Sequence, residues 1–457
     1  MKRALAIGEI VLGTIFPFAS HAAAQTLTTI HQFTGPPNDG AAPTAGVTIG
    51  SGSTLYGATY YGGDPVCSSA GASGCGTAFS LVPPASQGRS WSETVYAFPG
   101  RQGGGAYPEG NVTIRVDGLL YGTTFGGGSG SNGTAFSFKP PSSPGESIEE
   151  RVLYRFAGPP ADGASPAANV VIGSGGVLYG TTEFGGTYDN GTVFSLKPPG
   201  TAGGAWTETV LYNFAGYPRD GGLPTAGLVI GSGGVLYGAT EYGGTYNYGT
   251  VFSLTPPASP GGSWTETVVH DFSASSDGAY PEAAVVIGSG GVLYGTTVGQ
   301  GDFGFGTVFA VTPPASPGGD WSETVLHSFG GARDGASPNA AVTIGSGGVL
   351  YGTTDAGGID YGTVFSLTPP ASAGGPWAES VLYAFTGGDD GAYPYGGLTI
   401  SRDGVLYGTT YGGGTGSCSG GCGTVFAITS SKGEFYDAFA TLEDRDFADW
   451  HRQELQR

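Results

Sequence analysis

The sequence predicts an all-β protein: a seven-bladed β-propeller with four antiparallel strands per blade, closed with an N-terminal strand. The first observation is a motif, Leu-Tyr-Gly-(Thr/Ala)-Thr, which occurs seven times at steps of 65, 58, 58, 57, 57 and 56 residues. Its tyrosines are Tyr56, Tyr121, Tyr179, Tyr237, Tyr294, Tyr351 and Tyr407. Such a unit is too long for a single solenoid rung and is close to the period of a four-stranded propeller blade.

The second observation is the order of strands and turns inside each repeat. In the fourth repeat, apolar segments at 227–230, 235–240, 249–254 and 264–272 are separated by Ser232-Gly233-Gly234, by a Tyr- and Gly-rich loop and by a Pro- and Gly-rich segment. Glycine and proline at these places favour turns and end strands. Several of the strands are apolar on both sides, as expected where a neighbouring blade covers each face.

The third observation concerns the two ends of the repeat array. Residues 29–33 align with the fourth-strand residues 210–214, yet no repeat precedes them. We expect this segment to complete the seventh blade, because the two chain ends then meet in one sheet and no edge is left open. Residues 436–439 compete for the same place with a poorer register.

Two aromatic series recur in the fourth strand. Identical aromatic residues around a ring indicate packing rather than recognition, and the same holds for the tyrosines of the motif. The two series are Trp91, Trp206, Trp264, Trp321 and Trp377 at the start of the strand, and Phe98, Phe156, Phe214, Phe272, Phe329 and Phe385 near its end.

The chain divides into three segments. Residues 1–24 have the basic, apolar and small-residue zones of a secretory signal peptide, with a membrane anchor as the alternative. Residues 25–430 form the predicted propeller. Residues 431–457 form a charged tail whose apolar residues have near-helical spacing, so we expect either a short amphipathic helix or a loose tail. The sequence therefore predicts a secreted protein, extracellular or periplasmic, with no transmembrane segment in the mature chain.

The formal charge of −20, with only 16 Lys and Arg, excludes a nucleic-acid partner. The four cysteines form two close pairs, Cys67 with Cys75 and Cys418 with Cys422. In an exported chain disulfides are expected, and pairing between the two loops remains open because the first and last repeats are neighbours in a ring. Neither loop has a His neighbour, so no metal site is predicted there.

The string Gly-Val-Leu-Tyr-Gly-Thr-Thr at 176–182, with Gly185-Gly186 and Gly-Thr-Val-Phe at 191–194, resembles the GloVer tandem repeat of bacterial secreted proteins. The resemblance extends over roughly residues 27–429. Such repeats precede different surface-sorting segments, for which the family is described as choice-of-anchor. The tail of this chain lacks the Pro-Glu-Pro start and apolar helix of such a segment. The resemblance implies no catalytic activity.

In a propeller, the loops between strands two and three share one face with the loops between blades, and this loop-rich face is the predicted site. The inter-blade loops carry Asp-Gly-x-x-Pro at Asp39, Asp162, Asp220, Asp277, Asp334 and Asp390. Their carboxylates are expected to accept backbone N–H groups of a turn, with a cation-collecting ring as the alternative. The other loops place aromatic rings beside carboxylates, a combination that suits sugars, peptides or cationic groups. The predicted ligand-binding residues are Glu183, Phe184, Tyr188, Glu241, Tyr242, Tyr246, Tyr248, Asp360 and Tyr361.

These features predict a binding or structural module for a polysaccharide or protein ligand, acting as a monomer without a cofactor. The alternative is a carbohydrate-active hydrolase or lyase that uses carboxylates of the same face. No catalytic residue is predicted, because no nucleophile elbow, zinc-protease motif or phosphate-binding loop is present. Moreover, His31, His270 and His327 occupy one equivalent strand position, where other repeats have Tyr or Ala.

Overall fold

A computed structural model describes residues 25–430 except 65–66, 68–73, 87–88, 101–102, 141–148, 202, 260, 317 and 373. The predicted signal peptide, residues 1–24, and the predicted tail, residues 431–457, lie outside the described residues. The competing closing segment 436–439 lies outside them too.

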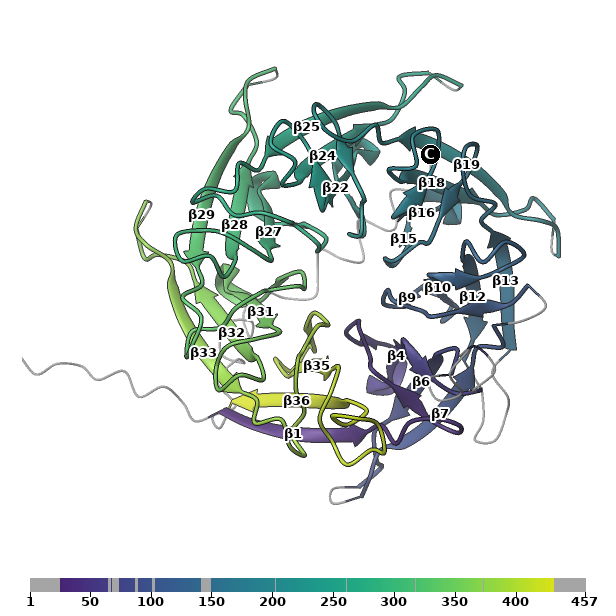
Figure 1. Cartoon of the computed structure of the whole chain (residues 1–457), viewed down its shortest axis with the longest axis vertical. Helices are drawn as coiled ribbons and strands as arrows, with labels where there is room; N and C mark the ends of the chain where they lie inside the picture. Colours follow the sequence, from purple (N-terminus) through teal and green to yellow (C-terminus); the bar gives the residue numbers. More distant parts are fainter. Residues whose placement is uncertain are drawn as a thin grey trace, which may run out of the picture.

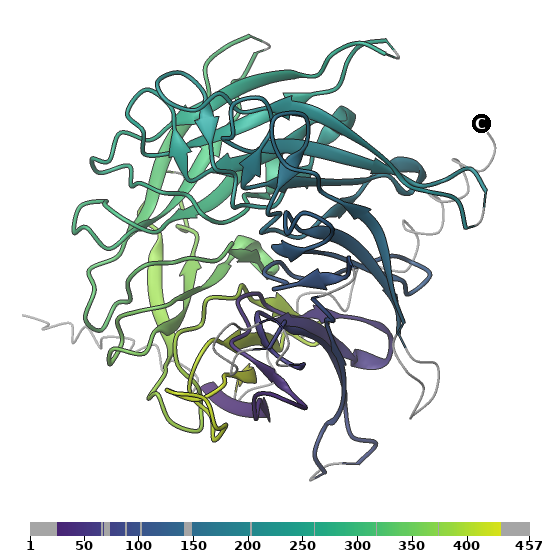
Figure 2. The same ribbon diagram turned by 45° about the vertical axis from the view of Figure 1, so that its right-hand side comes forward.

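The described chain forms seven four-stranded antiparallel sheets arranged in a ring around an axis (Figures 1 and 2). Blade 1 contains β3 (Thr48–Ile49), β4 (Leu55–Thr59), β6 (Thr77–Val82) and β7 (Ser92–Ala97). Blade 2 contains β9 (Thr113–Ile114), β10 (Leu120–Thr124), β12 (Thr134–Lys139) and β13 (Glu149–Arg155). Blade 3 contains β15 (Val171–Ile172), β16 (Leu178–Thr182), β18 (Thr192–Lys197) and β19 (Thr207–Asn213).

The remaining blades repeat this order. Blade 4 contains β21 (Val229–Ile230), β22 (Leu236–Thr240), β24 (Thr250–Thr255) and β25 (Thr265–Asp271). Blade 5 contains β26 (Val286–Ile287), β27 (Leu293–Thr297), β28 (Thr307–Thr312) and β29 (Ser322–Ser328). Blade 6 contains β30 (Thr343–Ile344), β31 (Leu350–Thr354), β32 (Thr363–Thr368) and β33 (Ala378–Ala384). Blade 7 contains β34 (Thr399–Ile400), β35 (Leu406–Thr410), β36 (Thr424–Ser430) and β1 (Gln25–Gln32).

The N-terminal strand closes the ring, as predicted. Strand β1 pairs antiparallel with β36, with Thr26 opposite Thr429 and Thr28 opposite Ala427. The two strands lie side by side in Figure 1, at the purple and yellow ends of the colour scale. Because the first and last strands share a sheet, the ring has no open edge.

The turn between strands one and two is a single 3₁₀ turn in five of the repeats. In blade 4 it is η4 (Ser232–Gly234), in which Gly233 has φ 69°. Glycine adopts this left-handed conformation without a Cβ clash, which explains the Ser-Gly-Gly sequence. The other turns of this kind are η1 (Ser51–Ser53), η3 (Ser174–Gly176), η5 (Ser289–Gly291) and η6 (Ser346–Gly348).

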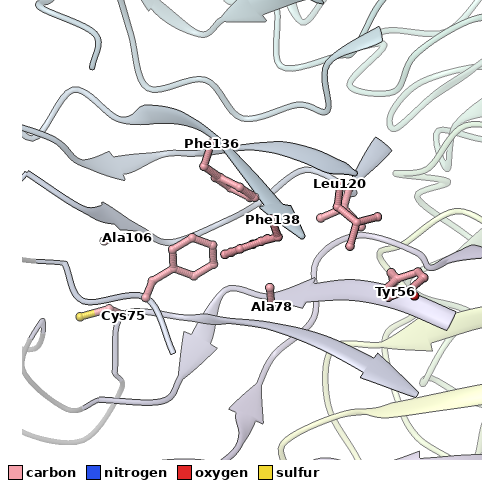
Figure 3. Packing of buried hydrophobic residues seen from close by; sticks show 9 residues of the cluster. Tyr56, Cys75, Ala78, Ala106, Leu120, Phe136 and Phe138 are labelled. Atoms are coloured by element: carbon pink, nitrogen blue, oxygen red, sulfur yellow. The ribbon is translucent and has the colours of Figure 1, made fainter. Parts of the chain in front are cut away.

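The hydrophobic core lies between blades. Each of the seven hydrophobic clusters joins two neighbouring blades. Between blades 1 and 2, for example, Phe136, Phe138 and Leu120 of blade 2 form one cluster with Ala78 and Tyr56 of blade 1 (Figure 3). Between blades 3 and 4, the fully buried rings of Phe214 and Phe252 meet edge to face at 5.1 Å.

Both predicted aromatic series serve this packing. The motif tyrosine and the strand-four tryptophan belong to different blades, and their rings meet edge to face, as Tyr237 and Trp321 do at 6.0 Å. The glycine of the motif admits an aromatic ring from strand three: a Cβ on Gly238 would lie 2.7 Å from Phe252 Cζ. The prediction that these aromatics pack is confirmed.

The two threonines of the motif make different hydrogen bonds. The first donates to the next blade, as Thr181 Oγ1 does to the carbonyl of Ala226 at 2.7 Å. The second is fully buried and bonds to a threonine of strand three, as Thr240 and Thr250 do at 2.9 Å. These bonds connect strands and blades at the same places around the ring.

On one face, the inter-blade loops and the loops between strands two and three pair with each other. In four blades the pairs form small two-stranded sheets: β2 (Gly40–Ala41) with β5 (Tyr61–Gly62), β8 (Gly105–Ala106) with β11 (Gly126–Gly127), β14 (Gly163–Ala164) with β17 (Phe184–Gly185), and β20 (Gly221–Gly222) with β23 (Tyr242–Gly243). In the other three a single bridge takes their place: Ala279 with Gly299, Ala336 with Ala356 and Ala392 with Gly412. The two loop families therefore converge on one face, as predicted.

Both disulfides form within a loop of this face. Cys67 pairs with Cys75 between β5 and β6, and Cys418 pairs with Cys422 between β35 and β36. Pairing between the two loops, which the sequence left open, does not occur. Each disulfide packs on a glycine just beyond strand four, Gly100 in blade 1 and Gly35 in blade 7.

Candidate binding site on the propeller axis

The innermost strands converge so closely on the axis that only small residues fit there. A Cβ on Gly46 would lie 2.2 Å from the carbonyl oxygen of Gly397, and one on Gly110 would lie 2.4 Å from the carbonyl carbon of Ala168. All seven blades contribute residues to an axial channel of about 310 Å³. Glycine and alanine therefore keep the axis open while the blades approach one another.

Residues at two repeated positions line the loop-rich mouth of this channel. One position follows the Leu-Tyr-Gly-(Thr/Ala)-Thr strand, and the other follows the proline of the inter-blade loop. The residue before that proline has a positive φ, between 53° and 62°, in all seven blades. Positive φ is strained for a residue with a side chain, so the loop conformation is imposed by the surrounding structure.

The proline itself anchors this conformation. A Cβ on Gly249 of blade 4 would lie 2.5 Å from Cδ of Pro281, which leads into blade 5. The corresponding Gly–Pro contact occurs at each of the other six junctions. The residue after the proline is thereby held at the axis.

These positions enclose an axial chamber of about 500 Å³ at the loop-rich end of the channel. Its walls come from all seven blades and are of two kinds: tyrosines gather on blades 7 and 1, whereas the acidic residues come from blades 2, 3 and 5. The lining residues are Thr44, Tyr60, Glu109, Ala167, Glu183, Thr225, Glu282, Asn339, Tyr395 and Tyr411. None of these described residues is Lys or Arg.

Burial makes the carboxyl groups of the chamber unusually weak acids. It raises the pKa of Glu109, Glu183 and Glu282 to about 7 each. Glu183 is also repelled by Glu109, Glu241 and Glu282, which raises its pKa further. At neutral pH each of these groups is therefore partly protonated, and each can donate as well as accept a hydrogen bond.

Polar atoms beside the chamber add to this capacity. Burial raises the pKa of Asp355 to about 6, although hydrogen bonds from Tyr395 and Asn339 lower it. Within the described part of the chain, Asp355 Oδ1 and Asn339 Oδ1 are buried without a hydrogen-bond partner. Such acceptors favour a ligand or solvent that donates hydroxyl or N–H groups.

The structure separates the predicted ligand-binding residues into four groups. Glu183 lines the axial chamber, and Glu241 is close enough to raise the pKa of both Glu183 and Glu282. Phe184 and Tyr242 lie in strands β17 and β23 of the small two-stranded sheets, and Tyr242 is 36% exposed. Tyr188 and Tyr246 project at the rim with 60% and 55% exposure, and Asp360 is also exposed.

Tyr248 and Tyr361 instead pack against their own blades. Tyr248 lies against the cluster between blades 4 and 5, and Tyr361 against the cluster between blades 6 and 7. A Cβ on Gly387 would lie 2.6 Å from the Tyr361 ring. They occupy the sequence position that holds Cys75 and Cys422 in the disulfide-bonded loops, so their rings serve the same local packing.

A second depression lies between blades 3 and 4 on the loop-rich face. It encloses about 390 Å³, and its wall includes Tyr217, Tyr242, Asn190 and Asn247. The ring of Tyr217 is 62% exposed. This rim groove therefore presents aromatic rings and amide groups together.

Of the ten residues that line the axial chamber, the predicted ligand-binding residues included only Glu183. Glu109, Glu282, Asn339 and Tyr395 follow the inter-blade proline, a position read only as part of a turn. The available signal was variability: after an invariant proline the seven repeats carry Thr, Glu, Ala, Thr, Glu, Asn and Tyr. In a chain of near-identical repeats, such a position has no common packing partner to preserve.

The aspartates of Asp-Gly-x-x-Pro serve the turn. Asp162 accepts the backbone N–H groups of Ala157 and Gly163, each at 2.7 Å, and Asp390 accepts that of Thr386 at 2.8 Å. Asp220 also accepts a hydrogen bond from the hydroxyl of Tyr212 at 3.0 Å. They bond to strand four and its exit, so they belong to the blade junctions and form no ring around the axis.

The fold and the repeat place this chain among seven-bladed propellers built from tandem repeats. Residues 65–309 and 259–449 match the sequence profile of the Gloeobacter/Verrucomicrobia repeat. Because these matches cover most of the chain, the protein belongs to this repeat family, and the resemblance drawn from its motifs is confirmed. A search among curated protein sequences finds no match.

Solved structures with a similar fold differ widely from one another. A putative 6-phosphogluconolactonase from Bacteroides uniformis is 15% identical, with a TM-score of 0.42, over 73% of this chain and 88% of that one. Drosophila Semaphorin 1a, extracellular domains 1-2, is 12% identical, with a TM-score of 0.43, over 89% and 88%. Trypanosoma rangeli sialidase is 9% identical, with a TM-score of 0.41, over 90% of this chain and 59% of that one. Similarities at this level carry no argument about activity.

In the described part of the chain, no helix has the length and hydrophobicity needed to cross a membrane.

Proposed function

We propose that this protein is an exported binding module that holds a glycan on its loop-rich face, with part of the ligand in the axial chamber. The observation that carries the proposal is that the chamber wall combines tyrosines from blades 7 and 1 with glutamates from blades 2, 3 and 5. The rings of Tyr60, Tyr395 and Tyr411 suit the C–H faces of a sugar, and Glu109, Glu183 and Glu282 suit its hydroxyls. The chamber volume of about 500 Å³ lies within the roughly 300–1,000 Å³ typical of small-molecule sites.

The charge of the chamber narrows the ligand class. Its described walls contain three glutamates and no cationic side chain, so a uronic or sialic acid would be repelled. A neutral or amino sugar meets partly protonated carboxyl groups that can both donate and accept. The rim groove around Tyr217 and Tyr242 would hold further residues of a longer chain.

Export is part of the same proposal. It depends on the predicted signal peptide, residues 1–24, and is supported by two disulfides, which persist in oxidising compartments.

The test is retention of the mature protein on neutral, amino and acidic polysaccharides, with released reducing ends measured in parallel. We expect retention on a neutral or amino polysaccharide, and its loss in Glu183→Gln and in Tyr411→Ala. The matched control is Glu208→Gln, because Glu208 is also held at a pKa of about 7 by burial but lies at a blade junction. Retention unchanged in both axial variants would contradict the proposal.

A hydrolase or lyase is the second candidate, and one observation favours it: a carboxyl group with a pKa near 7 in a cavity is suited to act as a general acid. Reducing ends that accumulate with time and disappear in Glu183→Gln would establish this activity. If no polysaccharide is retained or cleaved, a protein ligand becomes the leading hypothesis.

A further inference from the structure

Five of the seven blade junctions contain a polar cluster built from three repeated positions; the junction of blades 1 and 2 has Gly104 in place of the aspartate, and that of blades 6 and 7 has Leu27 in place of the glutamate. A tyrosine or histidine of strand four faces the aspartate of the following inter-blade loop, and a glutamate of the next blade's strand four lies nearby. Between blades 3 and 4 these residues are Tyr212, Asp220 and Glu266. The tyrosine donates to the aspartate, and Glu266 Oε1 is buried with no hydrogen-bond partner among the described residues.

The junction that closes the ring, between blades 7 and 1, departs from this pattern. Here His31 Nε2 lies 3.2 Å from Glu93 Oε1 and 3.8 Å from Asp39 Oδ2. One ligand atom from each residue lies within 4.8 Å of the other two, the one group of this kind in the described chain. At the junctions of His270 and His327, only the aspartate pairs with the histidine.

We propose that this ring-closing junction binds a divalent transition-metal cation such as zinc through His31 Nε2, Asp39 Oδ2 and Glu93 Oε1. One imidazole nitrogen and two carboxylate oxygens are ordinary zinc ligands, with bonds of roughly 2.0–2.2 Å. In a tetrahedral site such bonds put neighbouring ligand atoms about 3.3–3.6 Å apart. The separations of 3.2 and 3.8 Å from His31 Nε2 lie close to this spacing, and the two carboxylate ligand atoms lie within 4.8 Å of each other, so binding requires the side chains to move together by about an ångström or less.

The surroundings of the three ligands are also suitable. Asp39 Oδ2 accepts hydrogen bonds from the backbone N–H and the hydroxyl of Thr34, at 2.7 and 2.9 Å, and Asp39 Oδ1 accepts one from the N–H of Gly40 at 2.6 Å. These bonds fix the orientation of the carboxylate, as hydrogen bonds to metal ligands commonly do. The His31 ring packs edge to face on Phe33 at 4.8 Å. The side chains of His31 and Glu93 remain 18% and 20% exposed, whereas the two ligand atoms, His31 Nε2 and Glu93 Oε1, are buried.

The position of the site gives it a structural role. His31 belongs to β1, Asp39 to the loop leading into blade 1, and Glu93 to β7. These segments meet only when the N-terminal strand has closed the ring. A cation bound there would therefore stabilise the closed ring over any state in which β1 has detached.

The alternative is an ion pair, with a protonated His31 between the two carboxylates. Zinc and Co²⁺ distinguish the two when added to the chelator-treated full chain, with calorimetry, thermal unfolding and Co²⁺ visible absorption as readouts. We expect one ion per chain, a raised unfolding temperature and the d–d absorption of a tetrahedral site. All three should be lost in His31→Gln and kept in the matched variant His270→Gln.

Equal binding by the two histidine variants would overturn the proposal, because acids elsewhere would then hold the ion. Absence of stoichiometric binding to the wild-type chain would overturn it equally. Glu93→Gln provides a second variant if His31→Gln fails to fold, and it should also lose the tetrahedral absorption. The glycan-retention test does not use this site, so either proposal can fail alone.

Discussion

The blade junctions and the axial chamber both contain buried carboxyl groups, but they differ in how their residues repeat. At the junctions, the aspartate of the loop and the glutamate of strand four recur nearly unchanged around the ring. At the axis, the residue after the proline takes five identities in seven blades. A side chain that recurs in every blade meets the same neighbours each time, whereas one that differs makes the site asymmetric. Repetition therefore marks the scaffold of this protein, and variation marks its candidate site.

Among the substitutions that test this comparison, we expect the largest loss of stability in the hydrophobic clusters between blades. Phe252→Ala should lower the free energy of unfolding by about 3–5 kcal/mol, because it opens a cavity between two blades. The partly exposed axial Tyr411→Ala should cost much less. Denaturant unfolding of both variants measures the difference, and similar losses would mean that the axis is as important to stability as the junctions.

Removing a junction carboxylate comes next. Asp220→Ala leaves the backbone N–H of Ala215 and the hydroxyl of Tyr212 without their acceptor. We expect a loss of about 1–3 kcal/mol. The Glu183→Ala variant, by contrast, removes no side-chain hydrogen bond seen among the described residues. A smaller effect of the Asp220 change than of the Glu183 change would contradict a structural role for the junction aspartates.

The pH dependence of stability follows from both regions. Burial raises the pKa of Glu183, Glu266 and Glu282 to about 7 in the folded protein, against about 4.5 in the unfolded chain. The folded state therefore holds more protons between pH 4.5 and 7, and stability falls as the pH rises through this window. The unfolding temperature should be higher at pH 5 than at pH 8.

Single substitutions would show how much of this pH dependence comes from the blade junctions and how much from the axial chamber. Glu266→Gln at a junction and Glu183→Gln at the axis should each flatten the profile, mainly by raising stability at pH 8. A stability that rises from pH 5 to pH 8 would show that these carboxyl groups are ionised in the folded state.

The smallest effect is expected at the rim. Tyr246→Ala should change the free energy of unfolding by less than about 0.5 kcal/mol, because its ring is 55% exposed. Tyr248→Ala, two residues on, should cost more, since its ring packs against the cluster between blades 4 and 5. If glycans bind across the rim groove, Tyr242→Ala combined with Tyr246→Ala should abolish retention while the protein stays folded.

The period of the Leu-Tyr-Gly motif was sufficient to predict the number of blades, and the order of apolar segments and turns within a repeat predicted the strands of each blade. Residues 29–33 were sufficient to predict how the ring closes. These features depend on local residue order and on one recurring pattern of apolar side chains. The predicted strand 227–230 was too long, because only Val229 and Ile230 form β21 and pair with β22.

Only the closed ring decided which side chains share the chamber. Glu109, Glu183 and Glu282 lie in three different repeats, and nothing in the local sequence of any of them indicates the other two. The same closure brought His31 to Glu93. A repeat pattern is set by each blade's own packing, whereas the contents of the axis depend on the rotation of all seven blades about a common centre.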